Sequence, residues 1–164
     1  MPPDGTTLGE ITVRGNVTMD GYYNDPEATD RAMGDGWFHS GDAAVVHPDG
    51  YVEIRDRIKD VIISGGENIS SVEVEGALLR HPAVPEVAIV GLPSEEWGET
   101  PHAFVVLREG ATATSDDITA FAREHLAHFK APRGVTFVSE LPKTATGKIQ
   151  KFVLRKGAPN LARQ

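Results

Sequence analysis

Three short clusters hold the side chains whose types and spacing could do chemistry. The first is the run Trp37–Asp42, in which an aspartate follows a Ser–Gly pair. A carboxylate in this position can accept hydrogen bonds from two adjacent hydroxyl groups, such as those of a ribose. The same residues also fit an ordinary surface turn with a solvated aspartate. Asp42 is therefore a candidate for binding a vicinal diol.

The second cluster is the charged run Asp56–Asp60, which is followed closely by the run Ser64–Glu67. Arg57 offers several donors in a planar fork, which suits a ribose or a phosphate. The paired glycines Gly65 and Gly66 let a ligand approach the backbone, or permit dihedral angles that other residues avoid. A charged linker followed by a flexible turn would have the same composition. The cluster predicts either a ligand contact or a linker.

The third cluster is Pro142–Lys148, where a lysine follows a glycine. It is not a phosphate-binding P-loop, because that loop needs glycine where Pro142 stands and serine or threonine where Ile149 stands. Between Lys143 and Lys156 the chain has five basic residues and no acidic one. Such a basic segment suits an anionic small ligand, such as a nucleotide or coenzyme A, or it forms a solvated tail.

The composition excludes several classes of protein. The 24 acidic and 16 basic residues give a net charge of -8, which argues against a broad nucleic-acid-binding surface. The chain has no cysteine, so disulfides and cysteine-bound metals are excluded. His125 and His128 lack a third ligand nearby in the sequence, and we assign no metal site. The longest apolar stretch, Val87–Leu92, is too short for a membrane span, and Met1–Asp4 lacks the features of a secretory signal. A cytoplasmic protein is expected.

Strands and turns fill the first third of the expected structure. Apolar and polar residues alternate over Gly9–Gly15, as in a half-buried strand. The apolar runs Ala43–Val46 and Tyr51–Ile54 are separated by a Pro–Asp–Gly turn signal, which predicts a β-hairpin. The segment Asn24–Gly36 is polar and rich in turn residues, so no helix or strand is predicted there.

Helices and strands alternate beyond the charged run. Ser70 with Glu73 three residues later predicts the start of a helix that Pro82 must end. Apolar residues at helical spacing from Ile118 to Phe129 predict a second helix. Continuous apolar runs predict buried strands over residues 87–90 and 103–107, and a further strand is predicted over residues 135–141.

The order and spacing of the clusters resemble motifs of the adenylate-forming superfamily. This superfamily comprises acyl-CoA synthetases, adenylation domains of peptide synthetases, and luciferases. Gly9–Thr29 and Trp37–Asp42 resemble two successive motifs, Gly50–Ile69 resembles the next, and Pro142–Lys148 is similar to the last. The resemblance covers residues 5 to 156, and within the superfamily it is strongest to the C-terminal domain of AMP-forming, short- to medium-chain acyl-CoA synthetases.

The resemblance implies a role for individual residues. Asp42 would bind the ribose hydroxyls of ATP with help from Arg57, and Lys59 would be the hinge about which the C-terminal domain rotates. Lys148 would be the catalytic residue of adenylation, and it is also a candidate for regulatory acetylation, which would remove its charge. The channel for the thiol of coenzyme A would be lined by Ser64, Gly65, Gly66 and Glu67.

The resemblance also implies the reaction of a complete enzyme. A carboxylate, ATP and coenzyme A would give acyl-CoA, AMP and pyrophosphate, as in fatty acid metabolism. Mg²⁺ would accompany ATP in that enzyme without being bound by this chain. Two alternatives are a freestanding module that complements a separate large domain, and the lid of a peptide-synthetase adenylation domain. No nucleic-acid or membrane partner is expected.

The expected fold class is α+β. Residues 1–58 are expected to be a β-rich remnant of a large adenylation domain, and residues 59–157 a lid with a small antiparallel sheet flanked by helices. Residues 158–164 are expected to form a flexible tail. Because the superfamily's phosphate-binding loop is missing, the chain alone is expected to have little ligase activity. Exposed strand edges in residues 1–58 are expected to favour self-association.

Overall fold

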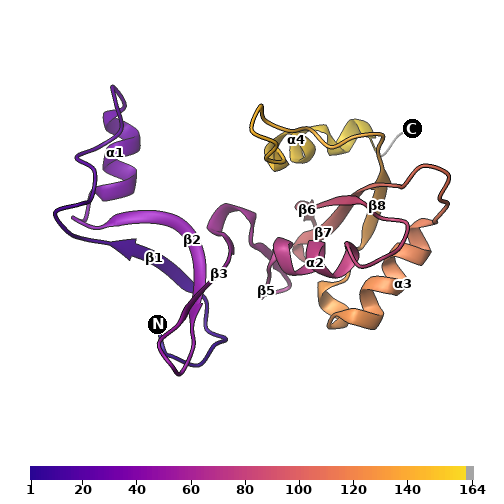
Figure 1. Cartoon of the computed structure of the whole chain (residues 1–164), viewed down its shortest axis with the longest axis horizontal. Coiled ribbons are helices and arrows are strands. Elements are labelled where there is room, and N and C mark those ends of the chain that lie inside the picture. The colour runs from indigo at the N-terminus through magenta and orange to yellow at the C-terminus, as the bar shows by residue number, and fades with distance from the viewer. Residues whose placement is uncertain (162–164) are drawn as a thin grey trace. The chain divides into compact units, whose positions relative to one another are not determined.

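The computed structural model describes residues 1–161, and their side chains through residue 157. The chain divides into two compact units, of which the first is Met1–Lys59 and the second begins at Asp60 (Figure 1). In the described residues no helix is both long and apolar enough to cross a membrane.

The first unit is a three-stranded antiparallel sheet with one helix. The strands β1 (Gly9–Val13), β2 (Phe38–Val46) and β3 (Val52–Arg57) are ordered β1-β2-β3. The predicted hairpin is confirmed as β2 and β3, which are joined by a turn in which the Gly50 N–H donates to the His47 carbonyl at 2.9 Å. Gly50 has a φ of +85°, a conformation that glycine adopts without steric strain.

Helix α1 (Pro26–Met33) lies in a segment for which the sequence predicted only turns. Its N-terminus is well defined, because the Asp25 side chain accepts a hydrogen bond from the Ala28 N–H and proline occupies the first turn. None of the helical residues is buried. Besides Pro26, its apolar residues are Ala28, Ala32 and Met33, so the apolar face that usually indicates a helix is small.

The second unit has a five-stranded sheet, ordered β5-β4-β7-β6 with β8 also paired to β7. Its strands are β4 (Ile62–Ser64), β5 (Glu67–Ile69), β6 (Glu86–Ser94), β7 (Gly98–Val106) and β8 (Gly134–Phe137). All pairs are antiparallel except β7 with β8, which is parallel. The sheet is thus the expected small antiparallel one, with one parallel strand added.

Helices cover both faces of this sheet. The helices α2 (Ser71–Leu78) and α3 (Ser115–His125) pack on one face, against alternate residues such as Ile89 and Val105. Helix α4 (Lys151–Leu161) follows the third cluster, and its Leu154 packs on the other face against Val90 and Phe104. Two short 3₁₀ turns are also present, η1 (Ile58–Asp60) at the junction of the two units and η2 (His128–Lys130) after α3.

Three helical details differ from the sequence prediction. Helix α2 ends at Leu78, before Pro82, and α3 ends at His125 because Leu126 is extended, so Phe129 lies in the following 3₁₀ turn. The basic segment, for which a solvated tail was one of two interpretations, contains α4, which runs through residues 158–161. The last part of the predicted flexible tail, residues 162–164, lies outside the described residues.

Candidate functional site

The two residues predicted to bind a ribose lie directly opposite each other in the first sheet. Asp42 on β2 is the register partner of Arg57 on β3, and Nη1 of Arg57 lies 3.0 Å from Oδ1 of Asp42. The Arg57 side chain is 56% exposed and that of Asp42 25%. The pairing fixes the carboxylate and leaves its second oxygen available to a ligand, which suits the recognition of a diol.

A local irregularity in β2 determines how Asp42 is presented. Between the register pairs of β1 and β2, Ile11 alone faces the segment Ser40–Asp42, so β2 has a bulge there. Gly41 in the bulge has a φ of +71°, and its N–H donates to Oε1 of Glu10 at 3.0 Å. The Asp42 N–H donates to Oγ of Ser40, also at 3.0 Å.

The sequence analysis missed two residues beside this bulge, Glu10 and His39. His39 lies between two carboxylates, with Nδ1 at 2.6 Å from Glu10 and Nε2 at 3.0 Å from Asp35. These hydrogen bonds, that to Glu10 first, raise the pKa of His39, and the His39 bond lowers the pKa of Asp35. Glu10 lies 29 residues from His39, and no sequence pattern connects them.

The predicted hinge residue lies at the junction of the two units. Lys59 is the middle residue of η1 and is exposed, and the first unit ends with it. The next residue, Asp60, is buried and accepts a hydrogen bond at 2.7 Å from Nη2 of Arg155 on α4. The start of the second unit is thereby tied to the helix that follows the third cluster.

The predicted thiol-channel residues form one tight turn between β4 and β5. Ser64 pairs with Glu67, and the two glycines between them have φ angles of +59° and +87°. Positive φ at both central residues defines a type I′ turn, which glycine adopts readily. A β-carbon at Gly65 would lie 2.7 Å from the ring of Trp97, whereas nothing lies within 4 Å of one at Gly66.

Lys148 lies on a small hairpin between β8 and α4. Lys143 and Ile149 form an isolated antiparallel bridge, and inside it the Thr144 N–H donates to the Lys148 carbonyl at 2.8 Å. Gly147 has a φ of +83°, and the Lys148 N–H donates to Oγ1 of Thr144 at 3.1 Å. The Lys148 side chain is exposed, and within the described residues its ammonium group has no hydrogen bond or ion pair.

The charged side chain of Lys151 on α4 anchors the hairpin's C-terminal end. Nζ of Lys151 lies 2.8 Å from Oε1 of Glu75 on α2, and both side chains are 15% exposed. Lys151 also donates to Oγ of Ser71, and Glu75 accepts from the Ile89 N–H at 2.8 Å. A backbone bond from the Gln150 N–H to the Pro142 carbonyl closes the hairpin at its base, at 2.8 Å.

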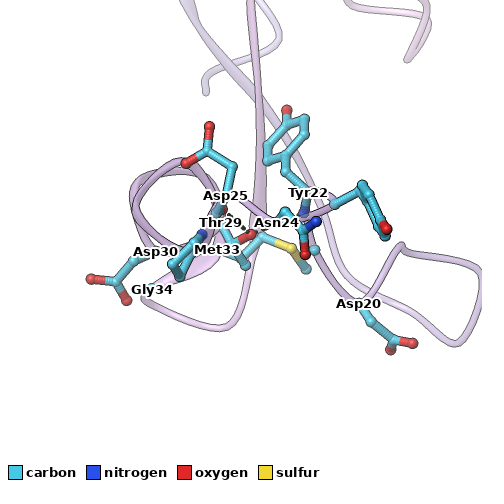
Figure 2. Close-up of a pocket in the computed structure, with 11 residues that line it drawn as sticks. Asp20, Tyr22, Asn24, Asp25, Thr29, Asp30, Met33 and Gly34 are labelled. Carbon is cyan, nitrogen blue, oxygen red and sulfur yellow. Dashed lines mark hydrogen bonds between the residues drawn. The ribbon is translucent and has the colours of Figure 1, made fainter.

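A shallow pocket of about 790 Å³ lies beside α1 in the first unit (Figure 2). Asp20, Asp25 and Asp30 are among its lining residues, but their carboxylates point away from one another in Figure 2. Asp25 is used in capping α1. Across the described residues no group of three or more histidine, aspartate or glutamate side chains could hold a metal ion.

The comparisons with known proteins identify the family. Residues 73–148 match the family model of the AMP-binding enzyme C-terminal domain. The chain belongs to this family of domains, within the adenylate-forming superfamily that its motifs indicated.

The relatives are CoA ligases. The chain is 54% identical over 166 residues to acetate–CoA ligase CCL3 of Humulus lupulus, and the match covers 98% of this chain and 29% of that protein. It is 53% identical over 166 residues to the peroxisomal acetate/butyrate–CoA ligase AAE7 of Arabidopsis thaliana, with the same coverage of 98% and 29%. The chain thus spans about 29% of the length of these relatives.

Solved structures share the fold. The crystal structure of ATP-bound MatB from Rhodopseudomonas palustris superposes with a TM-score of 0.83 at 37% sequence identity. The superposition covers 93% of this chain and 31% of the other. The α+β fold is therefore that of adenylate-forming enzymes.

Proposed function

We propose that this chain is the hinge and moving lid of an AMP-forming acyl-CoA synthetase. The whole enzyme converts a carboxylate, ATP and coenzyme A to acyl-CoA, AMP and pyrophosphate. The observation that carries the proposal is the exposed ammonium group of Lys148, held on a short hydrogen-bonded hairpin without a partner among the described residues. The CoA-ligase names of the relatives support it.

In the first half-reaction, a carboxylate oxygen attacks the α-phosphate of ATP and pyrophosphate leaves. Two anions must approach each other, and the Lys148 ammonium group offsets their repulsion as charge develops on the transferring phosphate. Asp42, held by Arg57, accepts hydrogen bonds from the ribose hydroxyls. Lys148 acts here as a fixed positive charge and transfers no proton.

In the second half-reaction, the thiol of coenzyme A attacks the acyl-adenylate and AMP leaves. Rotation about Lys59 withdraws Lys148 and brings the Ser64–Glu67 turn toward the thiol. A turn made of two glycines leaves room for the narrow pantetheine arm, and Gly66 has open space around its α-carbon. Lys59 is exposed and lies in a one-turn 3₁₀ segment where the two units join, and short connecting segments of this kind can absorb the change in dihedral angles that a hinge needs.

The proposed substrates are short- to medium-chain carboxylic acids. The names of the two relatives include acetate and butyrate. Mg²⁺ would enter with ATP and bind outside this chain. The cytoplasm is the proposed location, although relatives such as AAE7 are peroxisomal, so imaging of the tagged full-length protein tests the compartment. We further propose that Lys148 is open to acetylation and that the isolated chain self-associates through the first sheet.

The test separates the two half-reactions in the full-length enzyme. Lys148→Ala should slow ATP–pyrophosphate exchange by roughly a hundredfold or more, the usual effect of removing a preorganised electrostatic group. Thioester formation from supplied acyl-adenylate should stay nearly unchanged. Lys143→Ala is the matched control on the same hairpin, since Lys143 is already paired with Glu86 at 2.8 Å. It should leave both half-reactions unchanged.

An equal loss of both half-reactions in Lys148→Ala would contradict the proposed role. Supplying a phosphopantetheinyl carrier protein in place of coenzyme A distinguishes the peptide-synthetase alternative. Preferential acyl transfer to the carrier would replace the synthetase proposal. Gain of ligase activity on mixing this chain with a separate large domain would favour the freestanding module.

A further inference from the structure

A chain of side-chain contacts on the first sheet ends at the backbone of the proposed ribose site. It begins at Asp35, passes through the imidazole of His39, and reaches the carboxylate of Glu10. Each oxygen of Glu10 has its own donor, since Oε2 faces His39 at 2.6 Å and Oε1 accepts from the Gly41 N–H at 3.0 Å. Gly41 directly precedes Asp42.

Each link depends on the one before it. The glutamate is 27% exposed and the histidine 35%, so both are partly shielded from water. His39 holds Oε2 in place, and a carboxylate held at one oxygen keeps the other aimed at a fixed donor. The Gly41 N–H needs that acceptor, because the bulge of β2 interrupts the regular pairing with β1 at this point.

We propose that His39 is a positioning residue for the nucleotide site. Held between Asp35 and Glu10, it orients Glu10, which fixes the Gly41 bulge and presents Asp42 to the ribose. This inference rests on the proposed function, because it takes Asp42 to contact the ribose hydroxyls. It assigns a task to three side chains that the half-reactions leave without one.

The electrostatics are consistent with this arrangement. The hydrogen bond to Glu10 is the largest cause that raises the pKa of His39, and the bond to Asp35 is the next. The charged groups that face the imidazole among the described residues are Glu10 from β1 and Asp35 from the loop before β2. An imidazolium can donate to both carboxylates at once, whereas a neutral imidazole donates to one.

The experiment compares ATP with 2′,3′-dideoxy-ATP in the full-length enzyme without carboxylate substrate. Calorimetric titration gives the two dissociation constants, and their ratio measures the contribution of the ribose hydroxyls. His39→Gln should lower the preference for ATP by roughly five- to tenfold through weaker binding of ATP alone. Asp35→Asn changes the exposed first residue of this series of contacts. It should lower the preference for ATP by a smaller factor, without affecting folding.

His47→Gln is the matched control. His47 makes a similar contact on the same sheet, with Nε2 at 2.8 Å from Glu53, but it is not linked to Asp42. This variant should keep the preference for ATP. Equal weakening of both nucleotides in His39→Gln, or an unchanged ratio in both His39→Gln and Asp35→Asn, would overturn the inference. Asp42→Asn separates the two proposals: if it leaves the ratio unchanged, the ribose role itself fails.

Discussion

Gly65 and Gly66 have similar backbone angles but different surroundings. Both have positive φ, which a residue with a β-carbon adopts at a cost of about 1–2 kcal/mol. Only Gly65 also lies against an aromatic ring, since its added β-carbon would be 2.7 Å from Trp97. Trp97 also contacts Arg133, whose guanidinium group lies over the ring at 4.4 Å from its centre. The two glycines therefore serve different physical purposes.

We predict that Gly65→Ala lowers the free energy of unfolding by roughly 2–3 kcal/mol, since backbone strain and a steric overlap act together. Gly66→Ala should lower it by about 1 kcal/mol through the backbone alone. Urea denaturation followed by circular dichroism measures both. Equal losses would show that the contact with Trp97 does not constrain the turn. In the full-length enzyme, Gly66→Ala should impair thioester formation more than adenylation.

His102 makes the stability of the second unit depend on pH. It is partly buried on β7, its Nε2 lies 2.8 Å from Oγ1 of Thr136 on β8, and burial lowers its pKa below the ordinary histidine value of 6.5. The unfolded chain therefore binds a proton at a higher pH than the folded chain does. The contribution of His102 to the free energy of unfolding is present in full above pH 6.5. It is lost as the pH falls through the lower pKa that His102 has in the folded chain.

We predict that the free energy of unfolding falls less between pH 7.5 and pH 5.5 in His102→Gln than in the wild-type chain. The amide of glutamine can still donate to Thr136 but does not titrate. Urea denaturation at a series of pH values measures the difference. His128→Gln, at an exposed position, serves as the control and should keep the wild-type slope. Parallel curves for His102→Gln and wild type would contradict the prediction.

The sequence predicted those elements whose signal lies in local side-chain patterns. The hairpin of β2 and β3 follows from its turn residues, and α3 follows from its apolar stripe and acidic first turn. Thr114 caps α3 by a reciprocal pair of hydrogen bonds with Asp117. The stripe continues past the true end of α3 to Phe129, which lies in a separate 3₁₀ turn and is 43% exposed. Apolar spacing alone therefore does not record where the backbone stops being helical.

The two helices that the sequence analysis missed, α1 and α4, bury few of their described side chains. In α1 no side chain is buried, and in α4 Leu154 is buried while its neighbours Phe152 and Val153 are exposed. Contacts with distant residues hold α4 instead, through Lys151 and Arg155. The residues of the candidate site also differ in whether a local sequence pattern indicates them. Motifs indicated Asp42 and Arg57, whereas the Glu10–His39 contact arises only when β1 and β2 pair.

The Lys151–Glu75 pair provides a test of how α4 is held. Lys151→Ala leaves the carboxylate of Glu75, which is 15% exposed, with the Ile89 N–H but without its ammonium partner. We predict a loss of roughly 2 kcal/mol in the free energy of unfolding, because a shielded charge loses its counter-charge. Lys143→Ala breaks a pair of the same length whose side chains are 40% and 41% exposed, and it should cost less than about 1 kcal/mol. Similar losses of unfolding free energy in both variants would show that burial does not strengthen the Lys151–Glu75 ion pair.

The two units differ in how much hydrophobic core each contains. In the second unit, two clusters of buried side chains fill both faces of the sheet. Among residues 1–59, the buried hydrophobic side chains are Ala43, Ala44 and Val45, which are small and adjacent. Large apolar side chains of the first unit are exposed, including Tyr51 at 68% and Ile54 at 61%. The first unit thus presents apolar surface that a monomer in water does not cover.

This surface leads us to expect reversible self-association of the isolated chain. Strands β1 and β3 are the edges of the first sheet, and β3 places Val52 and Ile54 on an exposed face beside an unpaired edge. Sedimentation velocity over a range of concentrations should show a concentration-dependent shift to dimers or larger species. Ile54→Lys should suppress it, because a charge at the edge opposes pairing. Ile63→Lys, at a 57% exposed position in the second unit, should leave it unchanged. A single monomeric species at every concentration would contradict the expectation, and equal suppression by both variants would show that the contact is not confined to the first sheet.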